Sequence, residues 1–364
     1  MKTVKVNLGQ RSYNIYIGKN IIEKLWLLTK ITPHDVPLFV VTNNKVNTHY
    51  GEGLKKALRP ISKKIMIHEV PDTEKAKSFP VYVKTIRKLA RFATNTRPIV
   101  IAFGGGVTGD LTGFVASAYR RGVPYIQIPT TLLAQVDSAI GGKVAIDIKE
   151  AKNIVGNFYQ PKMVLCDLRF LRTLPKREIQ NGLVEIVKYG IIKDKKLFSY
   201  IERNLKQILT LDEKVIEHII YKSCSIKARV VETDEFDTKD HRAILNFGHT
   251  LGHAIETASS YRGSMAHGQA VAMGMVMASL IAVKLELLSK KNYEKIFSLV
   301  NKISAKTSTR HIKLEDVMTA LSYDKKFIYG VNRFILPTAV GHVRIVDQVP
   351  NSIINNVVKN CIRR

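Results

Sequence analysis

The chain has 364 residues with 45% hydrophobic content, which is enough for two packed domains, and a net charge of +27. Its three cysteines, Cys166, Cys224 and Cys361, are scattered and form no C-x-x-C pair, which excludes a disulfide framework and a thiolate zinc knuckle. The lysines are spread from Lys2 to Lys359 with no basic arm, interleaved aromatic motif or helix-turn-helix signature, so we expect no nucleic-acid partner.

The first half of the chain alternates strand-like and helix-like segments. Short apolar or β-branched runs predict strands at Val4–Leu8, Tyr13–Ile17, Leu38–Thr42, Ile65–Val70, Ile99–Phe103, Tyr125–Ile128 and Met163–Cys166. Helical spacing predicts helices at Ile21–Leu28, Asn47–Leu58 and Val81–Phe92. This alternation indicates an α/β domain with a mostly parallel sheet and crossover helices.

The second half is predicted to be mainly α-helical. Long helical patterns cover Arg177–Ile191, Leu197–Leu209, Lys214–Val231, His249–Ser259 and His267–Leu288, and strand-like pieces return at Arg333–Leu336 and Val343–Ile345. The change falls around Thr173-Leu174-Pro175. We therefore predict an α/β domain over 1–175 and an α-helical domain over 176–364.

No segment predicts secretion or membrane insertion. The first residues alternate polar and apolar, which suits a strand and not a signal peptide. The longest nearly apolar run, Ala270–Val283, is interrupted by Ser279 and is shorter than the roughly 18 residues that a spanning helix needs. We expect a cytoplasmic protein without a membrane partner.

A glycine loop follows the predicted strand Ile99–Phe103. Gly104 to Asp110 reads G-x-G-x-x-G and runs into a helical pattern, so its backbone could approach a phosphate at a helix N-terminus that Asp110 would cap. No acidic residue ends a strand about 20 residues later, as a dinucleotide fingerprint would have, so a tight strand–helix turn remains the alternative. Two further polar segments, Thr130-Thr131 and Asp72–Lys77, follow predicted strands, at whose carboxyl ends ligands collect.

Candidate metal ligands occur in the helical half. His249 and His253 are four residues apart on one helix face, His267 opens the next helical pattern, and Glu185 shares a face with Lys188. One carboxylate and two or three imidazoles would suit Zn²⁺ with an open coordination position. The spacing leaves open which histidine binds metal and which transfers protons, and a helical histidine often only packs.

Cationic residues lie near these motifs. Asp137 and Lys143 bracket a glycine-rich segment, and further candidates are Lys152, Asn153, Lys188, Lys227, Arg242, Lys325 and Lys326. Because the chain is so basic, the alternative is that these lysines are solvated surface residues without a ligand. The proximity of these residues to the glycine and histidine motifs favours an anionic substrate.

Taken together, these segments resemble the 3-dehydroquinate synthase family of sugar-phosphate cyclases. The most specific are Gln127–Ser138, which reads Q-I-P-T-T-L-L-A-Q-V-D-S, and Asn246–Glu256, which reads N-F-G-H-T-L-G-H-A-I-E. The resemblance spans most of the chain in order. It implies a Rossmann-like NAD-binding domain, a helical domain and a homodimer. It also implies conversion of 3-deoxy-D-arabino-heptulosonate 7-phosphate to 3-dehydroquinate and phosphate in the shikimate pathway, with transient reduction of NAD.

The resemblance also assigns roles to individual residues. It makes Glu185, His249 and His267 the ligands of Zn²⁺ or Co²⁺, and it leaves His253 for proton relay. It places around NAD the residues Asp72, Thr73, Glu74, Lys75, Ala76, Lys77, Gly106, Val107, Thr108, Gly109, Asp110, Thr130, Thr131, Lys143, Lys152, Phe170, Leu171, Arg172 and Thr173. The substrate contacts that it implies are Asp137, Lys143, Asn153, Lys188, Lys227, Arg242, Asn246, His253 and Lys326, with Arg121 reaching the site of a partner subunit.

The chain departs from the family pattern in three places, one of which is Ala139 in place of a common serine. The acidic segment before the histidine motif, Asp234 to Arg242, is one residue longer and lacks a glycine, and Asn43 stands where some relatives carry an aspartate for the adenosine ribose. The rival functions are another sugar-phosphate cyclase, a polyol dehydrogenase of the glycerol dehydrogenase type, and a nucleic-acid-binding protein. A phosphorylated sugar acid is the substrate class that the cationic residues favour.

Overall fold

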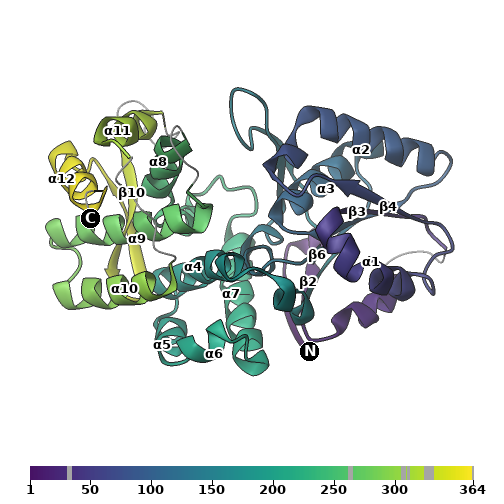
Figure 1. The fold of residues 1–364 in the computed structure, drawn as a ribbon, viewed down its shortest axis with the longest axis horizontal. Coiled ribbons are helices and arrows are strands. Elements are labelled where there is room, and N and C mark those ends of the chain that lie inside the picture. The colour runs from purple at the N-terminus through teal and green to yellow at the C-terminus, as the bar shows by residue number, and fades with distance from the viewer. Residues whose placement is uncertain (31–34, 261–264, 305–308, 310–311, 324–331, 363–364) are drawn as a thin grey trace. The chain divides into compact units, whose positions relative to one another are not determined.

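The computed structural model describes residues 1–30, 35–260, 265–304, 309, 312–323 and 332–362 (Figure 1). The chain forms two compact units, one of Met1–Leu174 with Leu211–Phe236 and the other of Pro175–Thr210 with Asp237–Arg364. The division into 1–175 and 176–364 stays a prediction. Leu211–Phe236, which lies in the predicted second domain, packs with the first unit.

The first unit is built on a seven-stranded sheet. Its strands are β1 (Lys2–Val6), β2 (Tyr13–Gly18), β3 (Leu38–Asn43), β4 (Ile65–Val70), β5 (Ile99–Gly104), β6 (Tyr125–Pro129) and β9 (Met163–Asp167). They follow the order β1-β2-β9-β6-β5-β3-β4, in which β1 pairs with β2 antiparallel and every other pair is parallel. The expected mostly parallel sheet is confirmed.

Helices cover both faces of this sheet, because its central strands are apolar on both sides. On β3, Leu38 and Val40 pack with α1 (Asn44–Leu58) and the 3₁₀ helix η2 (Ile21–Lys30). The alternate residues Phe39 and Val41 pack with α2 (Phe79–Phe92) and α3 (Gly106–Ala118). Successive side chains of a strand point to opposite faces, so one strand feeds both cores. Figure 1 shows α1, α2 and α3 with this sheet.

Four features of this unit differ from the sequence-based expectation or were missed by it. The helix expected at Ile21–Leu28 is a 3₁₀ helix, and a small hairpin forms from β7 (Lys143–Ile146) and β8 (Val155–Phe158). The residues of β8 are largely exposed, so they show no buried alternation that would mark a strand. Helix α7 (Glu213–Thr233) belongs to this unit. The connections include the short helices η1 (Gly9–Arg11), η3 (Glu74–Lys77), η4 (Tyr119–Arg121), η5 (Ala134–Ser138) and η6 (Leu168–Thr173).

The second unit is mainly α-helical, as expected. Its helices are α4 (Lys176–Ile192), α5 (Lys195–Arg203), α6 (Leu205–Leu209), η7 (His241–Asn246), α8 (His249–Ser260), α9 (His267–Lys284), α10 (Lys290–Ile303), α11 (Leu314–Ser322) and α12 (Asn351–Ile362). The strands β10 (Arg333–Ala339) and β11 (His342–Asp347) form an antiparallel hairpin. The helix expected at Leu197–Leu209 is divided into α5 and α6, and α10, α11 and α12 were not predicted.

Helix α9 is the apolar centre of this unit. Among the described residues it is the one helix long and apolar enough to cross a membrane by length and composition, but 61% of that stretch is buried inside the structure. Val271, Met275 and Ile281 of this helix have no exposed surface. This burial is the property of a core helix in a folded domain.

Candidate active site

Close packing of α8 on α9 brings three imidazoles together in the second unit. A Cβ atom on Gly274 of α9 would overlap the carbonyl oxygen of Gly248, and one on Gly252 would lie 3.0 Å from the carbonyl oxygen of Ala270. These glycines therefore let the two backbones approach more closely than any larger residue would. The ring centroids of His249, His253 and His267 consequently lie 5.4 to 5.7 Å apart.

A carboxylate from α4 completes this group. Side-chain donor atoms of Glu185, His249 and His267 all lie within 4.8 Å of one another, and His249 Nε2 is 3.4 Å from Glu185 Oε1. Glu185 is 1% exposed and forms an ion pair with Lys188, which is also buried. The ammonium of Lys188 contacts Oε2, whereas Oε1 has no hydrogen bond to the part of the chain that the structure describes. A buried carboxylate in this state suits a cation.

Burial sets the charge of the first imidazole. Loss of solvation, together with the ammonium of Lys188, holds the pKa of His249 well below its usual value, so its ring is neutral. The Nδ1 atom of His249 lies 3.2 Å from the carbonyl oxygen of Phe247. That carbonyl can only accept, so Nδ1 carries the proton and Nε2 presents a lone pair toward Glu185. This is the tautomer that a metal ligand needs.

The third imidazole has a carboxylate partner of its own. Burial alone would lower the pKa of His267, but a hydrogen bond to Glu256 and the charges of Glu185 and Glu256 outweigh it, so the pKa is raised. His267 Nδ1 lies 3.1 Å from Glu256 Oε2. His253, Glu256 and His267 also form a second group of potential ligands. We assigned no role to Glu256 from the sequence, although it stands three residues after His253 on the same helix face.

The residues of this unit fit a divalent metal. One carboxylate and two imidazoles are a common donor set for zinc, which leaves a coordination position open. The buried carboxylate of Glu185, whose Oε1 accepts no hydrogen bond from the described residues, and the neutral ring of His249 support such an ion. The geometry therefore agrees with the predicted ligands Glu185, His249 and His267, whose binding of a metal stays a prediction.

In the first unit, the glycine loop lies at the carboxyl end of β5 and opens α3. Gly105 is the N-cap of α3 and supplies no side-chain cap, so the expectation that Asp110 caps this helix is wrong. A Cβ atom on Gly106 would lie 2.9 Å from Ser138 Oγ, and one on Gly105 would lie 3.2 Å from a methyl group of Thr131. Thr130 and Thr131 follow β6, the strand next to β5. The loop, the helix N-terminus and these threonines therefore share one edge of the sheet.

Asp110 is instead part of a charged network around the buried Lys77. Its carboxylate lies 2.8 Å from the ammonium of Lys77, which also contacts Glu74 at 3.7 Å and the side chain of Asn153. Burial raises the pKa of Asp110 to about 6 against the opposing charge of Lys77. The main chain at Asn153 is in the left-handed region and its N–H donates to Asp147. Residues predicted for NAD and for substrate are thus joined in one network.

A second ion pair ties α7 to the turn after β6. Lys227 Nζ lies 2.6 Å from both Asp137 Oδ1 and the Asp137 carbonyl oxygen. Asp137 belongs to η5, a single π-helical turn, which is a feature often found at functional sites. Lys227 is 6% exposed. The structure therefore brings together two predicted substrate contacts that are 90 residues apart in sequence.

Several predicted cofactor residues follow other strands. Asp72 pairs with Lys45 at 2.7 Å, and Ala76 is buried in η3 beside the exposed residues Thr73 and Lys75. Lys143 lies over the Phe158 ring in the β7–β8 hairpin, and Lys152 is an exposed residue between these strands. The segment Phe170 to Thr173 lies in η6, directly after β9.

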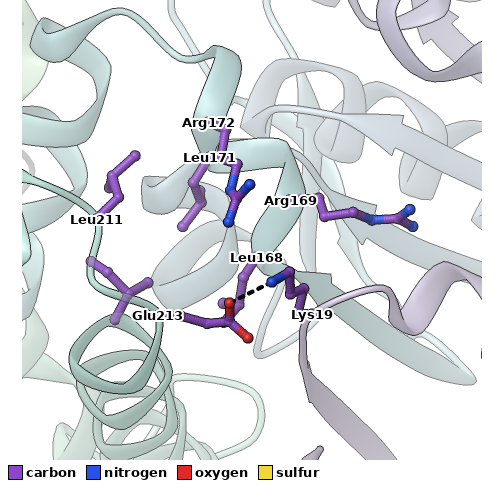
Figure 2. A pocket seen from close by; sticks show the side chains of 8 residues that line it. Lys19, Leu168, Arg169, Leu171, Arg172, Leu211 and Glu213 are labelled. Carbon is purple, nitrogen blue, oxygen red and sulfur yellow. Dashed lines mark hydrogen bonds and ion pairs between the residues drawn. The ribbon is translucent and has the colours of Figure 1, made fainter.

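The residues of η6 have different surroundings. The rings of Phe170, Tyr50 and Phe103 pack edge to face, and Tyr50 Oη is 2.9 Å from Thr173 Oγ1. Figure 2 shows Leu171 and Arg172 at a small pocket of about 20 Å³. The pocket is also lined by Lys19 and Glu213, which form an ion pair at 2.8 Å. It has room for about one water molecule. Phe170 packs in the core and Thr173 contacts Tyr50, while Arg172 lines the pocket.

The remaining predicted residues that the structure describes lie on α3, η4 and η7. Arg121 lies in η4 after the end of α3, whose 13 residues put it about 20 Å along the helix from the glycine loop of the same chain. Arg242 and Asn246 lie in η7, where Arg242 is buried. Val107, Thr108 and Gly109 form the first turn of α3. Lys326 lies outside the described residues.

Comparison with known sequences gives consistent matches over nearly the whole chain. The family described as 3-dehydroquinate synthase N-terminal matches residues 67–181, and 3-dehydroquinate synthase C-terminal matches residues 182–327. A 3-dehydroquinate synthase of Desulforamulus reducens is 42% identical over 350 residues, 96% of this chain and 97% of that protein. One from Idiomarina loihiensis is 40% identical over 367 residues, covering 99% and 100%.

Solved structures share the fold. A 2-deoxy-scyllo-inosose synthase, complexed with carbaglucose-6-phosphate, NAD⁺ and Co²⁺, is 26% identical over 99% of both chains, with a TM-score of 0.87. The 2-epi-5-epi-valiolone synthase of Streptomyces hygroscopicus, with NAD⁺ and Zn²⁺ bound, is 24% identical over 98% of this chain and 99% of that one, with a TM-score of 0.88, and shows the fold alone. An iron-containing alcohol dehydrogenase from Thermotoga maritima has a TM-score of 0.66 at 16% identity, covering 96% and 98%.

These findings define the class of protein. The chain shares its fold with a 2-deoxy-scyllo-inosose synthase that was solved with NAD⁺ and Co²⁺, and it belongs to the superfamily of sugar-phosphate cyclases. The identity of 40–42% to curated relatives over nearly the full length identifies the family within this class. The chain belongs to the 3-dehydroquinate synthase family, enzymes of the shikimate pathway.

Proposed function

We propose that this chain converts 3-deoxy-D-arabino-heptulosonate 7-phosphate to 3-dehydroquinate and phosphate, using NAD and one Zn²⁺ or Co²⁺ ion. The observation that carries the proposal is the meeting of Glu185, His249 and His267 at one point in a chain of this family. When bound, NAD supplies hydride acceptance and return, and the metal supplies polarisation of the reacting alcohol oxygen. The curated relatives over this length are named 3-dehydroquinate synthase, which favours this activity over that of a polyol dehydrogenase.

In this proposal, the second unit holds the metal. Glu185 provides a buried carboxylate, and His249 provides Nε2 because its Nδ1 is taken by the Phe247 carbonyl. Lys188, which contacts Glu185, keeps a fixed positive charge beside the ligands. That charge would stabilise a substrate oxygen as it becomes negative.

His253 is the proposed proton relay. Its ring lies 5.4 Å from that of His249 and 5.7 Å from that of His267, measured between centroids, and His253 is exposed. An exposed imidazole next to the ligands can exchange protons with solvent. The substrate phosphate itself is proposed to take the proton in the elimination step, with the protein mainly orienting it. Orientation of this kind can contribute several kcal/mol, up to roughly 7–11 in well-oriented cases.

The first unit is proposed to hold NAD. The uncapped N–H groups of α3 and the backbone of Gly106 suit its pyrophosphate, and the hydroxyls of Thr130 and Thr131 follow on the neighbouring strand. The network of Lys77, Glu74 and Asp110 would order the polar surface at this edge of the sheet. Asn43, whose side chain caps α1 by accepting from Val46 N, stands where an aspartate of some relatives would bind the ribose.

Cations and amides of the chain are proposed to bind the two anionic ends of the substrate. These residues are Lys188, Lys227, Arg242, Asn246, Asn153 and Lys326, with Asp137 fixing the ammonium of Lys227. Charge-assisted hydrogen bonds to a carboxylate and a phosphate would set the direction in which the substrate binds. A polyol without these groups would lose that energy.

We further propose a cytoplasmic homodimer. Arg121 is about 20 Å along α3 from the glycine loop of its own chain, so it would act at the site of a second copy. The test is to mix an Arg121→Ala chain with a chain inactivated at Glu185 and to measure activity. Complementation would restore about a quarter to a half of the activity if Arg121 acts across the dimer, and no recovery would contradict it.

The central experiment measures phosphate release from 3-deoxy-D-arabino-heptulosonate 7-phosphate, with and without chelator and NAD. Sedoheptulose 7-phosphate and glucose 6-phosphate are assayed in parallel as substrates of other cyclases. His249→Ala should lose both metal and turnover, whereas His342→Ala, at an exposed position on β11, should keep both. Full metal content and full turnover in His249→Ala would show that the ligand assignment is wrong.

A further inference from the structure

Glu256 is a carboxylate that faces the imidazole group but has no role in the proposed metal site. It follows His249 and His253 on α8 at intervals of seven and three residues, so all three lie on one face of the helix. Its Oε2 atom lies 3.1 Å from Nδ1 of His267, and it is partly buried. The contact joins α8 to the first residue of α9.

This contact decides which nitrogen of His267 is left for a cation. An imidazole has two ring nitrogens, and a carboxylate can only accept a hydrogen bond, so Nδ1 must carry a proton in this contact. Nε2 then remains as the lone pair that can face Glu185 and His249. The arrangement repeats the one at His249, where the Phe247 carbonyl takes the same position as Glu256.

The backbone before His267 is held separately from its ring. Gln269 Oε1 accepts a hydrogen bond from the N–H of Ala266 at 3.1 Å and one from Arg177 at 3.2 Å. These bonds fix where α9 begins, but they do not fix rotation of the His267 side chain, which is about a third exposed. Within the described residues, the hydrogen bond to Glu256 is the one that restricts the rotation of that ring.

We propose that Glu256 is the positioning residue for His267: its carboxylate holds the ring so that Nε2 points at the cation. The inference rests on the proposed function, since it requires that Glu185, His249 and His267 bind a metal. A carboxylate in this place also makes the imidazole a more basic ligand than a carbonyl partner would. It offsets part of the positive charge that a divalent ion and Lys188 bring to one buried place.

The structure contains one competing arrangement. Donor atoms of His253, Glu256 and His267 also lie within 4.8 Å of one another, so Glu256 could bind a cation directly. In the first arrangement Nδ1 of His267 donates a hydrogen bond to Glu256, and in the second Glu256 and His267 both bind the cation, so that hydrogen bond is lost. If Glu256 is a ligand, removing it changes the set of atoms around the metal; if it is a positioning residue, the set is kept and only its affinity falls.

The experiment titrates the apo-protein with Zn²⁺ against a chromophoric chelator and records the visible absorption of the Co²⁺ form. The variants are Glu256→Ala, Glu256→Gln and, as a matched control, Glu294→Ala, an exposed carboxylate on α10 of the same unit. Glu256→Ala should raise the Kd for Zn²⁺ about 10- to 100-fold while binding one ion per chain with an unchanged Co²⁺ spectrum. Glu256→Gln keeps an acceptor oxygen without the charge and should lose less, and Glu294→Ala should equal the unmodified chain.

Three outcomes would count against this inference. An unchanged Kd in Glu256→Ala would show that the carboxylate does not position His267. A shifted Co²⁺ spectrum or a lost ion in Glu256→Ala would make Glu256 a ligand. Failure of the unmodified chain to bind Zn²⁺ would overturn the proposed metal site itself, which separates that failure from the failure of this inference. Thermal unfolding of the apo-proteins, expected to be equal within a few degrees, shows whether a loss of affinity comes from a damaged fold.

Discussion

Acidification should destabilise the fold through His68, a buried imidazole on β4 that no proposed activity uses. Its side chain is 2% exposed, with Nδ1 3.3 Å from Lys88 Nζ and Nε2 3.2 Å from Thr85 Oγ1. Thr85 donates its own hydroxyl hydrogen to the Val81 carbonyl at 2.8 Å, so it accepts from Nε2. His68 is therefore held in one neutral tautomer, with Lys88 donating to the other nitrogen. Burial, followed by the charges of Lys88 and Lys84, lowers its pKa to about 4.

The sign and size of the effect follow from this pKa. The unfolded chain has a histidine pKa of about 6.5 and binds the proton first as the pH falls. The neutral ring of His68 makes its full contribution to the free energy of unfolding above pH 6.5, and this contribution is lost as the pH falls from 6.5 through 4. The difference of about 2.5 units corresponds to about 3 kcal/mol at 1.36 kcal/mol per unit. Because Lys88 is exposed and solvent screens its charge, we expect about 2 kcal/mol.

The assay is urea unfolding of the full chain at pH 7 and at about pH 4.5, compared with His68→Gln. Glutamine can donate to Thr85 and accept from Lys88, but it does not titrate in this range. Carboxylates elsewhere titrate in both chains, so they cancel in the difference. The free energy of unfolding of the unmodified chain relative to the variant should fall by about 2 kcal/mol on acidification. A difference that is the same at both pH values would refute the buried, neutral state of His68.

Three further predictions concern the charged pairs and the helix contact. Lys77→Met leaves the half-buried Asp110 unpaired and should lower the free energy of unfolding by about 3 kcal/mol at pH 7, measured by urea unfolding. Adding Asp110→Asn to Lys77→Met should recover most of this stability. Equal losses of stability in the single and double variants would contradict the pairing. Gly274→Ala places a Cβ atom against the α8 backbone, so it should lower the free energy of unfolding by about 1–3 kcal/mol and weaken Zn²⁺ binding. The control Gly53→Ala has open space around the new Cβ atom and should neither destabilise the chain nor weaken Zn²⁺ binding. Lys227→Met should lower kcat/KM for the heptulosonate phosphate at least about 10-fold with normal Zn²⁺ content; unchanged kinetics would remove it from the substrate site.

The strands and many of the helices could be predicted because their signals are local. Runs such as Ile99–Phe103 are apolar on both faces, and this property of a central parallel strand is visible in the sequence. Strand β8 could not be found this way, since its largely exposed residues carry no hydrophobic period, and β7, which has only four residues, was missed although its burial alternates. Helices α10, α11 and α12 were not predicted, although all three bury apolar residues on one face.

The candidate metal ligands illustrate the limit of spacing as evidence. The interval of four residues places His249 and His253 on one face of α8 equally well, so it cannot choose between them as ligands. The choice of His249 came from the family resemblance. The burial of His249 and its contact with the Phe247 carbonyl agree with that choice. Glu256 lies on the same helix face as His249 and His253, but its contact with His267 depends on the packing of α9 on α8, which the spacing does not show.

The sequence by itself determined the class of fold and the family, because these depend on hydrophobic periods and on motifs that are read along the chain. The tertiary structure alone decided which side chains meet. Lys227 contacts Asp137 because α7 packs with the first unit, and His267 contacts Glu256 because glycines let α8 and α9 approach. Such contacts depend on how elements distant in the chain pack, and packing distances of a few ångströms are not encoded in any one segment.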